Sequence, residues 1–88
     1  MSAKIEVYTM QNCPYCVRAK ALLHKKGVDF EEFDITKDDD KRKWLIQASG
    51  GRKTLPQIFI HGEPIGGYDD LYALQANGQL DEKIKQES

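Results

Sequence analysis

The chain's two cysteines, Cys13 and Cys16, lie three positions apart in the stretch CPYC. Pro14, a residue favoured at the first position of a helix, stands between them, and strong helix formers follow it. At the first turn of a helix, unpaired backbone N–H groups and the positive end of the helix dipole favour a thiolate over a thiol. Because a thiolate is the form that attacks disulfides, this arrangement indicates thiol–disulfide redox chemistry.

The two cysteines are expected to have different roles. Cys13, at the helix start, is the better placed to react. Cys16 lies one turn further in, more shielded yet within reach of Cys13, which suits a resolving thiol that displaces a bound partner and leaves an intramolecular disulfide. Tyr15 should project from the exposed corner between them. Arg18 and Lys20 would add positive potential, unless both are ordinary solvated side chains.

Other uses of a close cysteine pair have different requirements. A structural disulfide over so short a loop would stabilise by about 2 kcal/mol and would be unusual in a reducing compartment. A closed zinc site needs four ligands, and His24 and His61 fall outside the usual spacing of paired histidine ligands. Two buried, inert thiols are a further alternative. The spacing alone leaves all three open.

The composition favours one small domain that is not anchored to a membrane. The chain has 88 residues, enough for a single domain over residues 1–88. Its 13 Lys and Arg nearly balance 14 Asp and Glu, so no global charge would draw it to nucleic acid or to a membrane. It lacks an apolar stretch of about 18 residues and the apolar segment of a secretory signal. These features predict a soluble cytoplasmic monomer that binds neither nucleic acid nor membranes.

The cysteines should sit where a strand feeds a helix. Alternating apolar residues predict a strand over residues 4–9 and another over residues 28–35. Between them, a helix should begin at Pro14 and end at a C-cap, Gly27.

A second helix should follow the second strand. Thr36 is expected to be its N-cap, with three aspartates at 38–40 in the first turn, where the helix dipole favours negative charge. Trp44, Leu45 and Ala48 would form its apolar side.

The second half of the chain should contain a hairpin and two helices. The pattern predicts an apolar strand, a turn, a returning strand and two helices, over residues 54–60, 61–62, 63–67, 68–77 and 80–86. Pro64 cannot donate to a ladder, so the returning strand should lie at the sheet edge. The order β-α-β-α-β-β-α-α contains a βαβ unit, which requires a parallel pair and a right-handed crossover.

Three separated motifs make the chain resemble a known family. They are CPYC at 13–16, TLP at 54–56 before an apolar strand, and GGYDDL at 66–71 opening a helix. In this order they resemble the small bacterial-type dithiol glutaredoxins, over about residues 4–85. The resemblance implies an α/β thioredoxin fold with a four-stranded mixed sheet and flanking helices. It also implies glutathione as the reducing cosubstrate and no tightly bound cofactor or metal.

The resemblance further implies a glutathione site. The family proline matching Pro56 is cis, the alternative being a trans-proline that starts a strand, and it would turn the backbone of Leu55 outward to pair with a peptide-like ligand. Backbone groups near Tyr68 and Asp69 would hold the γ-glutamyl carboxylate, and the Asp69 side chain its amino group. The glutathione-binding residues expected are Cys13, Tyr15, Lys43, Thr54, Leu55, Pro56, Gly67, Tyr68 and Asp69.

A basic side chain should meet the other carboxylate of glutathione. The second helix offers Arg42 and Lys43, with Lys43 preferred, although both could be solvated charges. The sequence also departs from the family at two positions. Met10 replaces a lysine that is common three residues before the first cysteine, so the helix terminus must supply more of the thiolate stabilisation. Tyr68 stands where cysteine or serine is common, and its ring either lines the groove or covers the helix end.

By resemblance, the chain reduces protein disulfides and glutathione mixed disulfides, and its partners include disulfide-containing or glutathionylated proteins, with ribonucleotide reductase as one candidate. A rival is a redoxin of the same fold that is reduced by thioredoxin reductase, against which the GGYDD motif argues. A second is an iron–sulfur carrier in which two subunits and two glutathiones hold one cluster; Pro14 and Cys16 disfavour it. A third is an adaptor that binds peptides without electron transfer.

Overall fold

The computed structural model of the chain describes residues 4–85. It contains four strands and four helices: β1 (Ile5–Thr9), α1 (Pro14–Lys26), β2 (Glu31–Asp34), α2 (Asp39–Ala48), β3 (Gln57–Ile60), β4 (Glu63–Gly66), α3 (Tyr68–Ala76) and α4 (Gln79–Lys85). This order confirms the predicted β-α-β-α-β-β-α-α arrangement. The predicted end of the last helix, at residue 86, lies outside the described residues. Among residues 4–85, no helix has the length and apolar character needed to cross a membrane.

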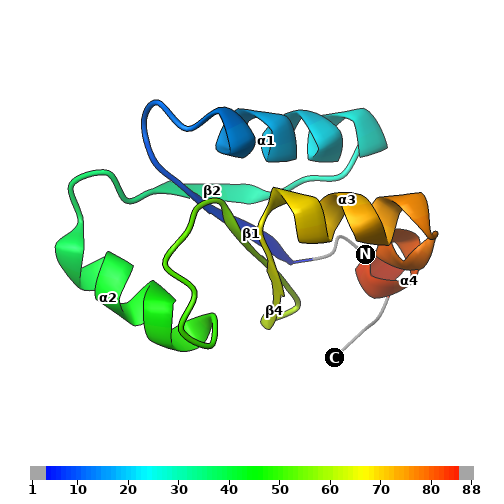
Figure 1. Cartoon of the computed structure of the whole chain (residues 1–88). Helices are drawn as coiled ribbons and strands as arrows, with labels where there is room; N and C mark the ends of the chain where they lie inside the picture. The colour runs from blue at the N-terminus through cyan, green and yellow to red at the C-terminus, as the bar shows by residue number, and fades with distance from the viewer. Residues whose placement is uncertain (1–3, 86–88) are drawn as a thin grey trace.

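The four strands form one mixed sheet in the order β2-β1-β3-β4. β1 pairs with β2 in parallel and with β3 antiparallel, and β3 and β4 form the predicted antiparallel hairpin. The parallel pair requires the crossover through α1. Pro64 lies in the edge strand β4, as its missing N–H group predicts. In Figure 1, α1 and α3 lie on one side of the sheet and α2 on the other.

Both faces of the sheet are buried. On one face, a cluster joins strands β1 and β3 to α1, α3 and α4, and its members are Ile5, Val7, Ala19, Leu23, Ile58, Ile60, Leu71 and Leu80. On the other face, the cluster beneath α2 consists of Tyr8, Ile35, Leu45 and Phe59. Val7 and Tyr8, neighbours in β1, belong to opposite clusters, and α2 covers the cluster that contains Tyr8. β1 is therefore held on both sides, which fixes the loop that leads from it to the cysteines.

The predicted apolar side of α2 is confirmed for Leu45, which is buried. Trp44 is different, because 45% of it is exposed. Its ring still packs beside the rings of Tyr8 and Phe59, at centroid distances of 5.6 and 6.2 Å. The ammonium group of Lys41 lies 4.4 Å from the centre of the Trp44 ring. Trp44 thus covers the edge of the second cluster rather than filling it.

The predicted N-cap of the second helix is wrong. Asp38 caps α2, its carboxylate accepting from the N–H of Lys41 at 3.0 Å. Thr36 lies in the preceding turn, where its N–H donates to the Asp34 carboxylate at 2.9 Å. Its hydroxyl oxygen accepts from the N–H of Gln11 at 2.8 Å. Thr36 therefore ties β2 to the loop before the cysteines, a contact between distant segments that the local sequence does not reveal.

Two strands, β2 and β3, begin three residues later than predicted. β2 begins at Glu31, because the N–H of Val28 still bonds to the carbonyl of Leu23 at the end of α1. Gly27 is the predicted C-cap, in the left-handed conformation with φ of 74°. β3 begins at Gln57 rather than at residue 54, since Pro56 has no N–H group for the ladder. The segment before β3 is therefore left as a loop that faces the cysteines.

Candidate active site

Cys13 is the N-cap of α1, and Pro14 is the first helical residue, as predicted. The sulfur of Cys13 accepts a hydrogen bond from the backbone N–H of Cys16 at 3.2 Å. Other N–H groups of the first turn also lack partners within the helix and point toward the same end. The half-buried Cys13 therefore stands at the end of α1 where unpaired N–H groups gather.

Cys16 is 2% exposed and is a free thiol, as is Cys13. Burial, and then its hydrogen bond with the Cys13 side chain, raise the pKa of Cys16 to about 12. Cys16 is therefore protonated at neutral pH while Cys13 is accessible. The difference in environment supports the predicted roles, in which Cys13 reacts first and Cys16 second.

In a Cys13→Ser variant, Cys16 should alkylate slowly at neutral pH. A raised pKa lowers the thiolate fraction at any given pH, so the rate should rise only as the pH approaches about 12. Loss of the Cys13 thiol removes one cause of the shift, but burial, the larger cause, remains. At pH 8 we expect a rate at least about 100-fold below that of a free cysteine of ordinary pKa. Mass spectrometry after timed iodoacetamide treatment measures it, and the urea-unfolded variant is the control. A folded variant that reacts as fast as the unfolded one would contradict this assignment.

A groove of about 330 Å³ opens beside Cys13. It is lined by Tyr15, Arg52, Thr54, Leu55, Pro56, Gly67, Tyr68, Asp69 and Asp70. Most residues expected from the resemblance to bind glutathione therefore meet here. The thiol form of Cys13 donates to the carbonyl oxygen of Leu55 at 3.7 Å, which links the sulfur to the groove. The Leu55–Pro56 peptide bond is cis, as the resemblance implied.

The start of α3 forms one end of this groove. Gly67 is the N-cap, and its N–H donates to the Asp70 carboxylate at 3.0 Å. The guanidinium of Arg52 also bonds to Asp70, at 2.8 Å. Burial alone would raise the pKa of Asp70, but the bonds from Arg52 and Gly67 outweigh it and lower that pKa. Asp70 is thus the ionised capping acid, while Asp69 is exposed at the groove.

Gly66 makes room for this ion pair. Its φ is +120°, and a Cβ atom there would lie 2.2 Å from a guanidinium nitrogen of Arg52 and 2.3 Å from a carboxylate oxygen of Asp70. A side chain at this position would displace both groups. The first glycine of the GGYDDL motif, Gly66, therefore has a concrete packing reason.

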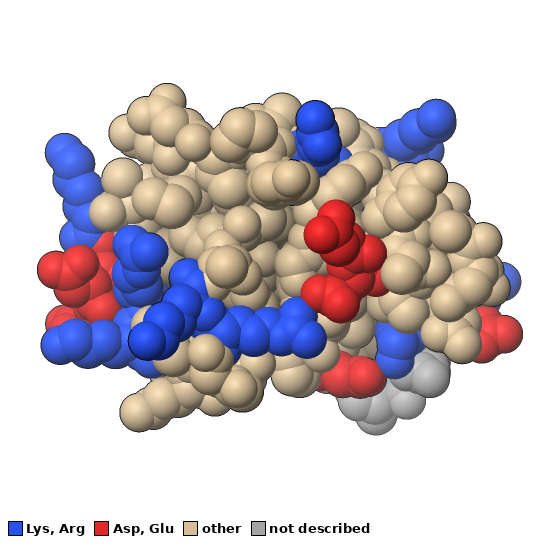
Figure 2. Space-filling model, viewed as in Figure 1, with Lys and Arg blue, Asp and Glu red and all other residues tan. Residues whose placement is uncertain are grey.

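The basic residue in the groove differs from the one expected. Among the described residues that line it, Arg52 supplies the positive charge, whereas Arg42 and Lys43 are absent from the lining and exposed on α2. Figure 2 shows Lys and Arg side chains gathered over α2 and the chain that follows it, next to acidic side chains at the start of α3. Arg52 was not among the residues expected from the sequence, although its position two residues before the TLP motif was a usable signal.

A second hollow, of about 670 Å³, lies on the other side of the cysteines. Its lining includes Met10, Cys16, Lys20 and Glu32. Lys20 forms an ion pair with Glu32 at 2.9 Å, and the Thr9 hydroxyl donates to the same carboxylate at 2.8 Å. Any positive potential that Lys20 adds near the cysteines is therefore largely offset by Glu32. Within residues 4–85, no three His, Cys, Asp or Glu side chains gather where they could hold a metal ion.

Comparison with known proteins agrees with this geometry. The family model described as Glutaredoxin matches residues 5–65. Glutaredoxin 3 of Escherichia coli is 55% identical over 83 residues, which cover 94% of this chain and 99% of that protein. A probable glutaredoxin of Synechocystis is 51% identical over 81 residues, covering 92% of each chain.

Solved structures agree on the fold. The solution structure of glutaredoxin from Brucella melitensis has a TM-score of 0.84 at 46% identity, covering 96% of this chain and 90% of that one. The crystal structure of a buckwheat glutaredoxin–glutathione complex has a TM-score of 0.86 at 27% identity, covering 93% of this chain and 76% of that one. With the thioredoxin fold, the helix-capping Cys13 and the buried Cys16, these matches identify the chain as a member of the glutaredoxin family, a dithiol thiol–disulfide oxidoreductase.

Proposed function

We propose that the chain uses glutathione to reduce protein disulfides and glutathione mixed disulfides. The observation that carries the proposal is the hydrogen-bond contact between Cys13 and Leu55, because it puts the reactive sulfur at the mouth of a groove that ends at a helix N-terminus. Such a terminus suits a carboxylate. The similar buckwheat protein was solved as a complex with glutathione, which supports the same ligand here.

The proposed chemistry has two routes. With a glutathionylated protein, the Cys13 thiolate attacks the glutathione sulfur, and the protein leaves as a thiolate that takes up a proton. The thiolate of a second glutathione then attacks the glutathione sulfur of the Cys13 mixed disulfide, which forms oxidised glutathione and releases the Cys13 thiolate. With a protein disulfide, Cys13 attacks one substrate sulfur, and Cys16 loses its proton and attacks Cys13. The substrate leaves with two thiols, and the enzyme holds a Cys13–Cys16 disulfide that glutathione reduces.

Within the groove, we assign the γ-glutamyl carboxylate to the N–H groups at Tyr68 and Asp69, which begin α3. The exposed Asp69 carboxylate meets the amino group. The backbone of Leu55 pairs with the cysteinyl part of glutathione, between Thr54 and the ring of Tyr15, while Pro56 and Gly67 form the adjoining wall.

Two residues, Arg52 and the originally expected Lys43, are candidates to bind the second carboxylate of glutathione. We assign it to Arg52, which lines the groove. Arg52→Gln should raise KM for glutathione about 5- to 10-fold, since a charge-assisted hydrogen bond is lost at a half-exposed site. Lys43→Gln is the matched control and should change KM less than about 2-fold. Steady-state kinetics on both variants measure this, and a larger effect from Lys43→Gln would restore the original expectation.

A coupled assay tests the electron source. Glutathione with glutathione reductase and NADPH should turn the oxidised protein over, and thioredoxin reductase with NADPH should not. The reverse result would favour the redoxin alternative, and a coloured dimer after anaerobic reconstitution with iron and sulfide would favour the cluster carrier. The proposal also includes a single domain that works as a cytoplasmic monomer, with ribonucleotide reductase as one candidate partner.

A further inference from the structure

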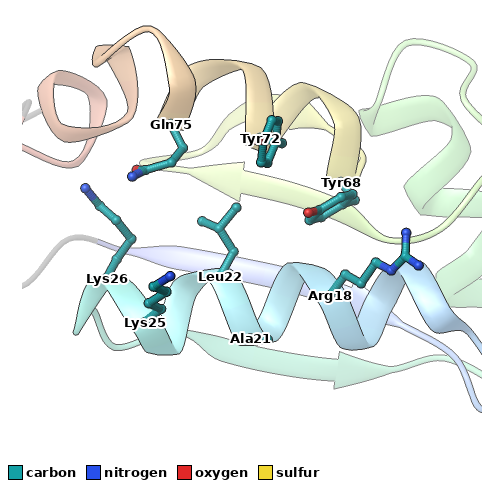
Figure 3. Close-up of a pocket in the computed structure, with 8 residues that line it drawn as sticks. All are labelled: Arg18, Ala21, Leu22, Lys25, Lys26, Tyr68, Tyr72 and Gln75. Carbon is teal, nitrogen blue, oxygen red and sulfur yellow. The ribbon is translucent and has the colours of Figure 1, made fainter.

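A second groove, of about 510 Å³, lies between α1 and α3. Its lining includes Arg18, Leu22, Lys25, Lys26, Tyr68 and Tyr72. Figure 3 shows the side chains of α1 facing those of α3 across it. Apart from Tyr68, none of these residues lines the groove assigned to glutathione. The cysteine chemistry described above makes no use of this surface.

Helical periodicity produces the groove. From Arg18, the lining residues of α1 follow at steps of three and four positions up to Lys25, so they share one helix face. The lining residues of α3 start at Tyr68 and recur at similar steps through Tyr72. The facing sides of the two helices therefore form a channel along their length, with Leu22 on its floor. Tyr72 is 55% exposed there, so its ring presents apolar surface along one side of the channel.

The groove is continuous with the redox centre. Tyr15, which lies between the two cysteines in the sequence, is 6.3 Å from Tyr68 between ring centroids. Tyr68 is in turn 6.1 Å from Tyr72. The three rings form a row that leads from the cysteines into the channel. Arg18 stands at the near end, with its guanidinium 5.5 Å from the centre of the Tyr15 ring.

The charged side chains that line the groove are all basic. Its described lining contains Arg18, Lys25 and Lys26, and no acidic side chain. Lys26 already pairs with Asp81 of α4. Arg18 and Lys25 are exposed, at the two ends of the apolar floor. A ligand that fits must therefore combine apolar side chains with negative charge.

We propose that this groove binds an extended, apolar and acidic segment of a protein-disulfide substrate while the disulfide is attacked at Cys13. The inference rests on the proposed reduction of protein disulfides. Along the helix, Lys25 lies about 18 Å beyond Cys13, at about 1.5 Å per residue. An extended chain advances about 3.3 Å per residue, so the acidic residues should lie about five to six positions from the substrate cysteine. Apolar side chains in between would cover Tyr72 and Leu22.

Peptide disulfides test the proposal. Two probes are symmetrical disulfides of a peptide with one central cysteine and leucines near it. One probe has glutamates about five and six positions away on both sides, and the other has lysines there. Pre-reduced protein is mixed with each probe without glutathione, so the result does not depend on the electron source. In each turnover, the two protein thiols become one disulfide and the probe yields two peptide thiols. The acidic probe should react about 10-fold faster at low salt.

Three variants locate the effect. Lys25→Glu should slow the acidic probe about 5- to 10-fold and bring the two probes close to the same rate. Lys37→Glu makes the same charge change at an exposed residue between β2 and α2, and should alter the rate less than about 2-fold. Tyr72→Ser should slow both probes alike, by a few fold, because the apolar contact is lost. All three variants should keep the wild-type rate on a small glutathione mixed disulfide.

Each adverse outcome has a distinct meaning. Equal rates for the two probes, or equal losses from Lys25→Glu and Lys37→Glu, would overturn the groove assignment alone. A concentration-dependent dimer that Tyr72→Ser dissociates would also overturn it, because a second copy of the chain would then cover the groove. Failure of either probe to oxidise the wild-type protein would refute protein-disulfide reduction itself, and the groove assignment with it.

Discussion

Cys13→Ser is expected to abolish both the reduction of protein disulfides and the reduction of glutathione mixed disulfides. Each route begins with the Cys13 sulfur, and a serine hydroxyl does not attack a disulfide at neutral pH. Cys16 cannot replace it, because Cys16 is buried and its pKa is raised to about 12. We expect a loss of at least about 1,000-fold in kcat/KM on either substrate, as for removal of a nucleophile.

The serine variant should keep the fold, so a loss of activity can be attributed to the missing thiol. Its oxygen can still accept from the Cys16 N–H, so the N-cap of α1 is retained. Circular dichroism and a melting curve check this point. Substantial activity in a folded Cys13→Ser protein would falsify the assignment of the nucleophile.

Cys16→Ser is expected to separate the two routes. Reduction of a glutathione mixed disulfide should stay within about 2-fold of wild type, because glutathione in solution resolves the Cys13 intermediate. Reduction of a protein disulfide should fall at least about 10-fold, since the intramolecular thiol supplies a high effective concentration that free glutathione does not match. The measurement is kcat/KM on both substrate types in the same glutathione buffer.

The intermediate itself provides a second measurement. Without glutathione, Cys16→Ser should accumulate a mixed disulfide between Cys13 and the substrate protein, visible by non-reducing gel and mass spectrometry. Because residue 16 is 2% exposed, a buried hydroxyl there costs up to about 3 kcal/mol, so stability must be compared as well. Cys16→Ala, which adds no polar group, is the matched control. Equal losses on both substrates in stable variants would refute the resolving role.

Local sequence signals predicted the parts of the site that depend on neighbouring residues. Pro14 sets the start of α1, and this places Cys13 at the N-cap, because an N-cap and a first helical residue are adjacent by definition. Gly27 ends the same helix for an equally local reason. The prediction for Thr36 failed because its hydroxyl accepts a hydrogen bond from Gln11, in the loop after the neighbouring strand β1, and no window of local sequence contains both residues.

The sequence by itself determined which sulfur starts a helix and in what order the motifs occur, because helix initiation, capping and hydrophobic alternation act over a few residues. Only the tertiary structure decided which distant side chains meet that sulfur. It brought Arg52 rather than Lys43 into the groove beside Leu55, and it packed Cys16 so closely that only 2% of this residue is exposed. It also set α1 against α3 to form the cationic channel. Which side chains meet depends on how whole helices and strands pack. The energy of that packing is the sum of many small contacts between residues far apart in the chain.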